Sequence, residues 1–304
     1  DTDEVVGQVM IPNGHLAGHR VLLKQGDDVV DVTTTDFAGN FKFDSVVPGQ
    51  YTVVFESYWY PTVSEGVEAG GRVTLSVPDK GVVFAASWDE SINADFSVAT
   101  TEPSQKDAQV VPAYVGNGVQ VNGPYAFLGA NQIVSNLQGT IDMWIQVPDD
   151  DQVYNLLHIY ASGSGTYTVS GWTRLHFQFG WKDDEGKDVL DTARFHIASY
   201  RGQPIHLALT WNTLEARMSA YVNGVAVGQH LRRRNEGGGQ WSETEVTSPI
   251  PLEKLVIPQA MFIGISNQGA NPYPSPIDQL CIRNVELSAE EVLEDYQRKS
   301  QYLD

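Results

Sequence analysis

The stretch GTIDMWIQV, residues 139–147, decides the fold of most of this chain. In it, Ile141, Met143 and Ile145 alternate with Asp142 and Trp144. A period of two between apolar and polar residues predicts a strand that is buried on one side only. The same period recurs in three later runs: WTRLHFQFGW (172–181), ARFHI (193–197) and IHLALTW (205–211).

If these strands share a sheet, one of its faces is apolar and the other is polar. Proteins hold sugars through hydrogen bonds to the hydroxyl groups and through an aromatic ring under the pyranose, and these polar faces offer both. An alternative remains open, namely an ordinary sandwich face whose polar groups are satisfied internally. The candidate ligand-binding residues are Trp144, His158, Arg174, His176, Gln178, Arg194 and His196.

The chain is strongly acidic, with 19 Lys and Arg residues against 38 Asp and Glu residues and a formal net charge of −19. Such a surface repels nucleic acids and anionic membranes, so neither is expected as a partner. No run approaches the roughly 20 apolar residues of a membrane span, so membrane insertion is not expected. The single cysteine, Cys281, excludes an internal disulfide framework, and a buried apolar role is its simplest interpretation.

Residues 1–79 contain short strand-like runs separated by turn residues, which is typical of a small β-sandwich. The run TTTDFAGNFKFDSVVPGQYTVVFESYWYP (33–61) resembles the carboxypeptidase regulatory-like (transthyretin-like) family in its T-D-x-x-G-x-F hairpin and its V-x-P-G-x-Y motif. The resemblance implies a non-catalytic accessory domain. Its Tyr58-Trp59-Tyr60 end is a candidate sugar platform, although packing is the simpler interpretation. The segment VPDKG (77–81) marks the expected boundary between this domain and the next.

Residues 80–304 resemble the concanavalin A-like, laminin-G-like jelly-roll family. The pieces GTIDMWIQV, IHLALTWN, AYVNGVAVG and IDQLCIRNVELSAEEV follow one another in the order typical of that family. We therefore expect an all-β chain, a small β-sandwich followed by a jelly-roll β-sandwich. One short C-terminal helix is predicted from the N-cap Ser288 to about Lys299. The resemblance also implies a secreted or cell-surface bacterial protein that is larger than this chain.

Two kinds of catalysis are compatible with this fold, and the sequence disfavours one more strongly than the other. Retaining glycosidases need two carboxyl groups about 5 Å apart, and the E-x-D-x-E strand motif that supplies them does not occur here. A polysaccharide lyase remains an alternative. Arg174 or Gln178 would neutralise a uronate, and His176 with Tyr160 or Tyr200 would serve as base and acid. The strand motifs of known lyase families do not match, so an enzyme is not the preferred prediction.

The run RRRNEGGGQW, residues 232–241, is the sharpest compositional contrast in this acidic chain. Three arginines beside a glycine hinge and Trp241 would suit an anionic sugar, a sulfate or a uronate. Trp241 is therefore a further candidate ligand-binding residue. The alternative is a solvated, flexible loop without a ligand.

The jelly-roll resemblance also implies one structural Ca²⁺, held by an acid of the opening turn and an acid of the closing strand. Asp95 and Asp278 stand at the matching positions. Carboxylates and backbone carbonyls are the hard oxygen ligands that calcium prefers. No histidine or cysteine pair has the spacing of a zinc site.

The preferred functional hypothesis is a non-catalytic carbohydrate-binding or adhesion module, with a polysaccharide or glycan as its partner. A uronate-specific polysaccharide lyase is the second hypothesis. A structural spacer beside another catalytic domain of the parent chain is the third.

Overall fold

The computed structural model describes residues 2–150, 152–160, 167–171, 174–255 and 257–303. The chain divides into two compact units, Asp1–Val82 and Val83–Asp304, so the division falls close to the expected boundary after residue 79. As predicted, the chain is mostly β-structure with one longer helix at the C-terminus.

The first unit is built from two sheets, one with the order β4-β1-β7 and the other with the order β3-β2-β5-β6. Their strand pairs are antiparallel except for the parallel pair β1–β7. The strand β6 was not predicted, because its sequence VSEGVE places a glycine between two isolated valines and gives only a weak pattern. The strands are β1 (Asp3–Met10), β2 (Arg20–Gln25), β3 (Asp28–Thr34), β4 (Asn40–Val46), β5 (Gln50–Glu56), β6 (Val63–Glu68) and β7 (Arg72–Ser76).

Aromatic residues at the end of β5 serve packing in this unit. Tyr60 is fully buried, and its ring lies edge-on to the ring of His19 at 5.5 Å between centroids. Its hydroxyl oxygen accepts a hydrogen bond from the backbone N–H of His15 at 3.0 Å. Tyr60 is therefore unavailable as part of a sugar platform, and packing accounts for it.

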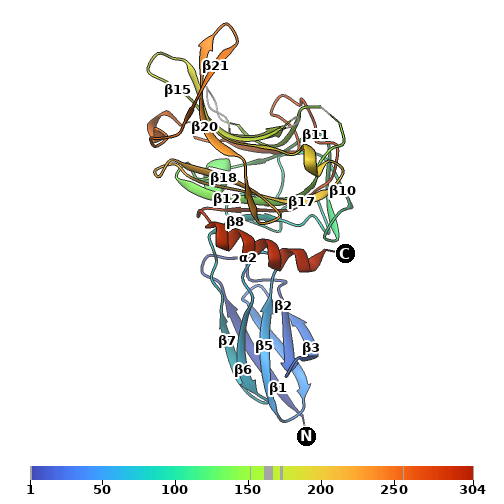
Figure 1. Cartoon of the computed structure of the whole chain (residues 1–304). Helices are drawn as coiled ribbons and strands as arrows, with labels where there is room; N and C mark the ends of the chain where they lie inside the picture. The colour runs from blue at the N-terminus through green and yellow to red at the C-terminus, as the bar shows by residue number, and fades with distance from the viewer. Residues whose placement is uncertain (1, 151, 161–166, 172–173, 256, 304) are drawn as a thin grey trace. The chain divides into compact units, whose positions relative to one another are not determined.

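The second unit is a sandwich of two β-layers (Figure 1). The long strand β11 (Asn117–Leu128) pairs with strands of both layers. The short strands β9 (Phe96–Ser97) and β10 (Gln105–Pro112) pair with β8 and β11. The back layer holds β19 (Val225–Val227), β18 (Arg217–Val222), β17 (Pro204–Asn212), β12 (Gln138–Gln146), β23 (Ile277–Arg283) and β8 (Val82–Ala86). The front layer holds β22 (Ala260–Ile263), β13 (Tyr154–Tyr160), β14 (Tyr167–Gly171), β15 (Arg174–Lys182), β16 (Asp188–His196), β20 (Gln229–Gly237) and β21 (Gln240–Glu245).

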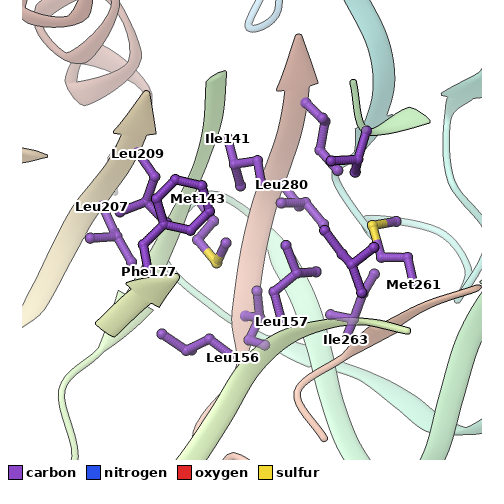
Figure 2. Packing of buried hydrophobic residues seen from close by; sticks show 14 of the residues in the cluster. Ile141, Met143, Leu156, Leu157, Phe177, Leu207, Leu209, Met261, Ile263 and Leu280 are labelled. Carbon is purple, nitrogen blue, oxygen red and sulfur yellow. The ribbon is translucent and has the colours of Figure 1, made fainter. Parts of the chain in front are cut away.

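Apolar side chains of the two layers meet in one core, as Figure 2 shows. Phe177 and Phe179 of β15 contact Trp211 of β17, with ring centroids 5.6 and 5.8 Å apart. Gly139 lies directly opposite Trp211, and a Cβ atom at this position would lie 2.3 Å from the indole ring. The glycine that begins the deciding stretch therefore makes room for the central tryptophan of the core.

One expectation about the deciding stretch is wrong. β12 and β17 are buried on both faces, not on one. The helix α2 (Ala289–Lys299) covers their outward side (Figure 1). The ring of Tyr296 in this helix lies 6.1 Å from the ring of Trp144 and 5.8 Å from that of His206, measured between centroids. Alternation of polar and apolar residues reports two different faces, but not whether a helix covers the polar one.

The helix itself forms as predicted. Ser288 is its N-cap and accepts a hydrogen bond from the N–H of Glu291, whose side chain in turn accepts from the backbone of Ser288. This capping box satisfies two otherwise unpaired N–H groups. Among the residues with described positions, no helix is both long and apolar enough to cross a membrane. Shorter helical turns are α1 (Ala130–Ile133), η1 (Ala198–Tyr200), η2 (Leu252–Lys254) and η3 (Ser300–Tyr302).

Candidate functional site

The register of β15 and β16 brings five predicted site residues to one face. Arg174 lies directly opposite His196, and His176 lies directly opposite Arg194. Gln178 stands two residues further along β15 and therefore points to the same side. The core-facing neighbours, such as Phe177, point the other way. The predicted run began at residue 172, but residues 172 and 173 lie outside the described part of the chain.

The same face continues onto the flanking strands of the front layer. Through the pairs of β14, His158 of β13 stands in the row of Gln178, and Thr192 follows it on β16. On the other side, Arg233 of β20 is paired with Glu243 of β21. We call this outward side of the front layer the polar face. Its side chains include His158, Arg174, His176, Gln178, Thr192, Arg194, His196, Arg233, Trp241, Glu243 and Glu245.

Trp144 does not belong to the polar face, which corrects the sequence prediction. It lies on β12 in the back layer, and only 2% of its surface is exposed. Its ring packs against His206 at 5.1 Å and against Tyr296 of α2. A sugar could stack on this ring only if the helix were displaced, so Trp144 is a structural residue.

His176 lies at the centre of the polar face and is half-buried. Burial lowers the pKa of its imidazole to about 4, and the positive charges of Arg233, Arg194 and Arg174 act in the same direction. Glu243 opposes them only in part. At neutral pH the ring is therefore uncharged and offers one hydrogen-bond donor and one acceptor.

Glu243 ties two of these arginines together. Its two carboxylate oxygens accept from both terminal nitrogens of Arg194, at 2.8 and 3.0 Å. The Nε of Arg233 lies 3.1 Å from Glu243 Oε1, and its guanidinium group lies 5.1 Å above the ring of Trp241. The hydrogen bonds from Arg194 are the main reason why the pKa of Glu243 is lowered. Glu243 is therefore held as a carboxylate against the polar face.

The arginine-rich run forms a hairpin, not a flexible loop. β20 and β21 pair along their length, and the tip Gly237–Gly239 consists of three glycines with positive φ. Because side chains alternate along a strand, the three arginines point to two sides. Arg232 binds Asp191 and Arg234 binds Asp183 on the opposite side, each through an Nε–Oδ distance of 2.6 Å. The expectation that all three reach one ligand is wrong, since only Arg233 faces the polar side.

Three polar atoms of this face lack a hydrogen-bond partner within the described part of the chain. They are Nε2 of His158, Oγ1 of Thr192 and Nε of Arg233, and all three are buried. Burial lowers the pKa of His158, whose ring lies edge-on to Phe262 at 6.5 Å. Buried polar groups normally have a partner in the protein or in water, so these atoms are places where water or a ligand would bind.

A separate hollow lies at one end of the sandwich. It has a volume of ≈ 500 Å³ and is lined by residues of the segment Asn131–Gln138 together with Ile257, Pro258 and Asn284. None of these residues belongs to the polar face. The hollow therefore offers a control region for binding experiments.

Asp278, the first of the two predicted calcium ligands, is fully buried at the start of β23. Its Oδ2 accepts from the N–H groups of Tyr114 and Val115 at 3.1 and 2.8 Å, and its Oδ1 has no partner among the described residues. Burial raises the pKa of this carboxyl to about 8, against the effect of those N–H groups, and the nearby charge of Asp89 raises it further. A buried carboxylate oxygen with no partner fits a cation ligand.

The second predicted ligand, Asp95, is otherwise engaged. Its Oδ2 accepts from the backbone N–H of Ser87 at 2.5 Å. The acid whose charge acts on Asp278 is Asp89, which itself accepts from the N–H of Asn117 at 2.9 Å. Over the described ranges, no group of three or more His, Cys, Asp or Glu side chains could hold a metal ion. Any cation at Asp278 would thus depend on backbone carbonyls.

The family model of the concanavalin A-like lectin/glucanases superfamily matches residues 120–293, which is more than half of the chain. The chain belongs to the concanavalin A-like lectin/glucanase superfamily. No curated protein sequence is significantly similar to it.

Solved structures with the same concanavalin A-like fold include bacterial toxin domains. The binding domain of botulinum neurotoxin serotype D has a TM-score of 0.52 and 13% identity over 72% of this chain and 51% of its own. The serotype G binding domain has a TM-score of 0.52 and 14% identity over 72% of this chain and 51% of its own. The serotype D ligand-binding domain in complex with N-acetylneuraminic acid has a TM-score of 0.51 and 13% identity over 72% of this chain and 51% of its own. The chain thus spans about half the length of these solved chains, and the likeness shows the fold alone.

Sequence reasoning missed Thr192 and Glu243 of the polar face in this concanavalin A-like domain, and it named Arg233 only together with Arg232 and Arg234. A signal for Arg233 and Glu243 was present, because the GGG tip between two polar runs is typical of a hairpin. Had RRRNEGGGQWSETE been interpreted as paired strands, alternation would have separated Arg233 from Arg232 and placed it with Glu243.

Proposed function

We propose that the concanavalin A-like unit is a non-catalytic glycan-binding module whose ligand lies on the polar face. The observation that carries the proposal is the row of His158, Gln178 and Thr192 beside His176 and Arg194. Donors and acceptors stand there in fixed register on neighbouring strands, and two of the buried polar atoms have no hydrogen-bond partner among the described residues. Groups that rigid strands hold in place lose little entropy when they bind a sugar.

An aromatic contact completes such a site. Trp241 is half-exposed on the polar side of β21 and takes the stacking role that the sequence had assigned to Trp144. Support of a second kind comes from the superfamily. A neurotoxin domain with this fold has been solved with N-acetylneuraminic acid, a sugar. The proposal for this chain rests on its own residues.

The surrounding architecture belongs to the same proposal. The first unit would be an accessory, carboxypeptidase regulatory-like sandwich, supported by its two-sheet form and by its hairpin motifs. The module would act in a secreted or cell-surface protein beside other domains of a larger parent chain. A structural Ca²⁺ would be held by the carboxylate of Asp278, supported by the buried Oδ1 that has no described partner.

Binding is a better account of the polar face than lyase chemistry. A lyase base must accept a proton efficiently near the working pH. The pKa of His176 is lowered to about 4, by burial and by the surrounding arginines, which makes it a weaker base than an ordinary histidine. Tyr160 and Tyr200 are both partly buried and packed against the apolar core, so their positions are accounted for by packing.

The test is a glycan screen followed by titration calorimetry of the best ligand with single variants. Gln178→Ala and His176→Ala should weaken binding by about ten- to a hundredfold, since each loses hydrogen bonds to the ligand. Arg217→Ala, an exposed residue of the back layer, is the matched control and should bind normally. Unchanged binding in both polar-face variants, with the folds intact, would contradict the proposal.

A further inference from the structure

We infer that the polar face selects sugars that carry a carboxylate, and that Glu243 occupies the position of this carboxylate in the ligand-free protein. The inference rests on the proposed function, and it adds the class of ligand and an internal competitor for it. Three steps support it: the local charge, the shape of the ion pair and the contrast with neighbouring pairs.

The local charge is the first step. The charges that act on His176 come from three arginines, Arg174, Arg194 and Arg233, and from one anion, Glu243. Glu245 lies further along the same side of β21, so cations still outnumber anions there. The whole chain, in contrast, carries a formal net charge of −19. A cationic site on an acidic protein attracts an anionic ligand selectively, because the rest of the surface repels it.

The second step is the shape of the contact between Arg194 and Glu243. Both terminal nitrogens of Arg194 donate to both oxygens of one carboxylate, at 2.8 and 3.0 Å. This planar fork recognises a carboxylate in two parallel hydrogen bonds. The Nε of Arg233 lies 3.1 Å from the same carboxylate, an ion-pair contact without hydrogen-bond geometry. A uronate or sialate carboxylate would find this complete arrangement if Glu243 turned away.

The third step is that Glu243 is able to leave whereas its neighbours are not. Its side chain is 36% exposed on the outermost strand β21, so it can turn toward solvent, where water replaces its hydrogen bonds. Asp191, which holds Arg232 on the opposite side of β20, is 0% exposed and would be buried without its arginine. Arg174 is exposed, and the described residues give it no ion-pair partner. A ligand carboxylate therefore has one arginine at hand and two more that it gains by displacing Glu243.

The experiment compares acidic and neutral sugars that differ only in the carboxylate. Glucuronate-terminated and N-acetylneuraminate-terminated oligosaccharides are titrated by calorimetry beside glucose-terminated and asialo counterparts, and a sulfated glycan distinguishes carboxylate from general anion binding. The acidic member of each pair should bind at least tenfold tighter, and raising the salt concentration should reduce this preference. Equal preference for the sulfated glycan would overturn the carboxylate assignment.

Glu243→Gln is the decisive variant, because it should improve binding. Because the variant removes the competing carboxylate, affinity for the acidic sugar should rise by about two- to fivefold and affinity for the neutral sugar should stay unchanged. Arg174→Gln should lower acidic binding only. The matched control is Glu286→Gln, which removes a similar two-pronged contact from Arg217 in the back layer and should change neither affinity. Weaker acidic binding in a folded Glu243→Gln protein would overturn the competitor role.

The pKa of His176, followed by NMR, is an independent readout. A bound carboxylate would offset the three arginine charges, so the acidic sugar should raise this pKa and the neutral sugar should not. The outcomes also separate the two proposals. Equal binding of acidic and neutral sugars that still depends on Gln178 overturns this inference alone. Failure of every glycan to bind the polar face overturns both.

Discussion

Lys299, in the last turn of α2, places its ammonium group on the carboxylate of Asp142 in β12, and neither side chain is more than 2% exposed. The same ammonium group also lies 2.7 Å from Asp295, and His206 Nε2 lies 3.2 Å from the Asp142 carboxylate. This buried network fixes the helix to the back layer. It also explains why the acid that the sequence placed on a polar strand face takes no part in ligand binding.

Removing Lys299 should destabilise the fold strongly. Lys299→Met leaves the buried carboxylate of Asp142 without its cation, which typically costs about 3–5 kcal/mol of unfolding free energy. Asp295 is 12% exposed and keeps its contact with Arg298. Urea denaturation measures this loss. The control is Lys182→Met, whose pair with Asp188 is nearly half-exposed on both sides and should contribute about 0–1 kcal/mol. Equal losses in the two variants would show that the buried network does not hold α2.

The same network should make the protein sensitive to acid. Burial by itself raises the pKa values of Asp142 and Asp295. The charge of Lys299 outweighs it only together with His206 for Asp142 and with Arg283 and Arg298 for Asp295, and both pKa values lie below the ordinary range. Groups with lowered pKa values stabilise the fold above their unfolded pKa of about 4 and lose this contribution as the pH falls. Unfolding free energies should therefore decline below about pH 4. The double variant Asp142→Asn, Lys299→Met should show a flatter decline over that range.

Calcium should raise the melting temperature through Asp278. A ligand that binds only the folded state adds about 2.7 kcal/mol at a hundredfold excess over its dissociation constant. Asp278→Asn should abolish the response. Comparison of Asp89→Asn with Asp95→Asn identifies the second acid, and the contacts described above favour Asp89. An identical melting temperature in EDTA and in millimolar calcium would mean that the site does not bind this ion.

How far the sequence alone predicts the fold depends on how local the signal is. The alternation in residues 174–182 and the N-cap Ser288 are local patterns, and both are found in the structure as expected. The burial of Trp144 depends on where α2 packs, and the two lie far apart in sequence. No pattern within β12 reports this contact, so a strand buried on both sides was predicted to be exposed on one.

The candidate site divides in the same way. Arg174 and His176 were found because they alternate with core residues on a strand of strong period. Arg233 and Glu243 were not assigned individually, because their side depends on the pairing of β20 with β21 and on the turn between them. The polar alternation was visible in the sequence, but without apolar residues it gave no direction toward the core.

Uronate-containing polymers should be bound without being cleaved. A lyase would produce an unsaturated sugar that absorbs near the ultraviolet edge. Burial and the arginine neighbours lower the pKa of His176 to about 4, which makes it a weak base. No such product is therefore expected with any uronate polymer near neutral pH. Turnover that disappears in His176→Ala would instead identify the protein as a lyase.

Arg232 and Arg233, adjacent in sequence, should have separate roles that two variants distinguish. Arg232→Gln removes two contacts, at 2.6 and 2.9 Å, from the fully buried carboxylate of Asp191. It should cost about 2–4 kcal/mol of unfolding free energy, because a buried charge loses its partner. Ligand affinity should stay normal at temperatures where the variant is folded.

Arg233→Gln should do the reverse. Its partner Glu243 remains bound to Arg194 and is 36% exposed, so the unfolding free energy should change by less than about 1 kcal/mol. Affinity for an acidic sugar should fall about tenfold, because the third contact to the carboxylate is lost together with the cation over Trp241. Thermal melts and calorimetry on both variants make the comparison. If both lose stability alike and neither changes binding, the hairpin is a structural extension, and the alternation that turns Arg233 toward the polar face has no functional consequence.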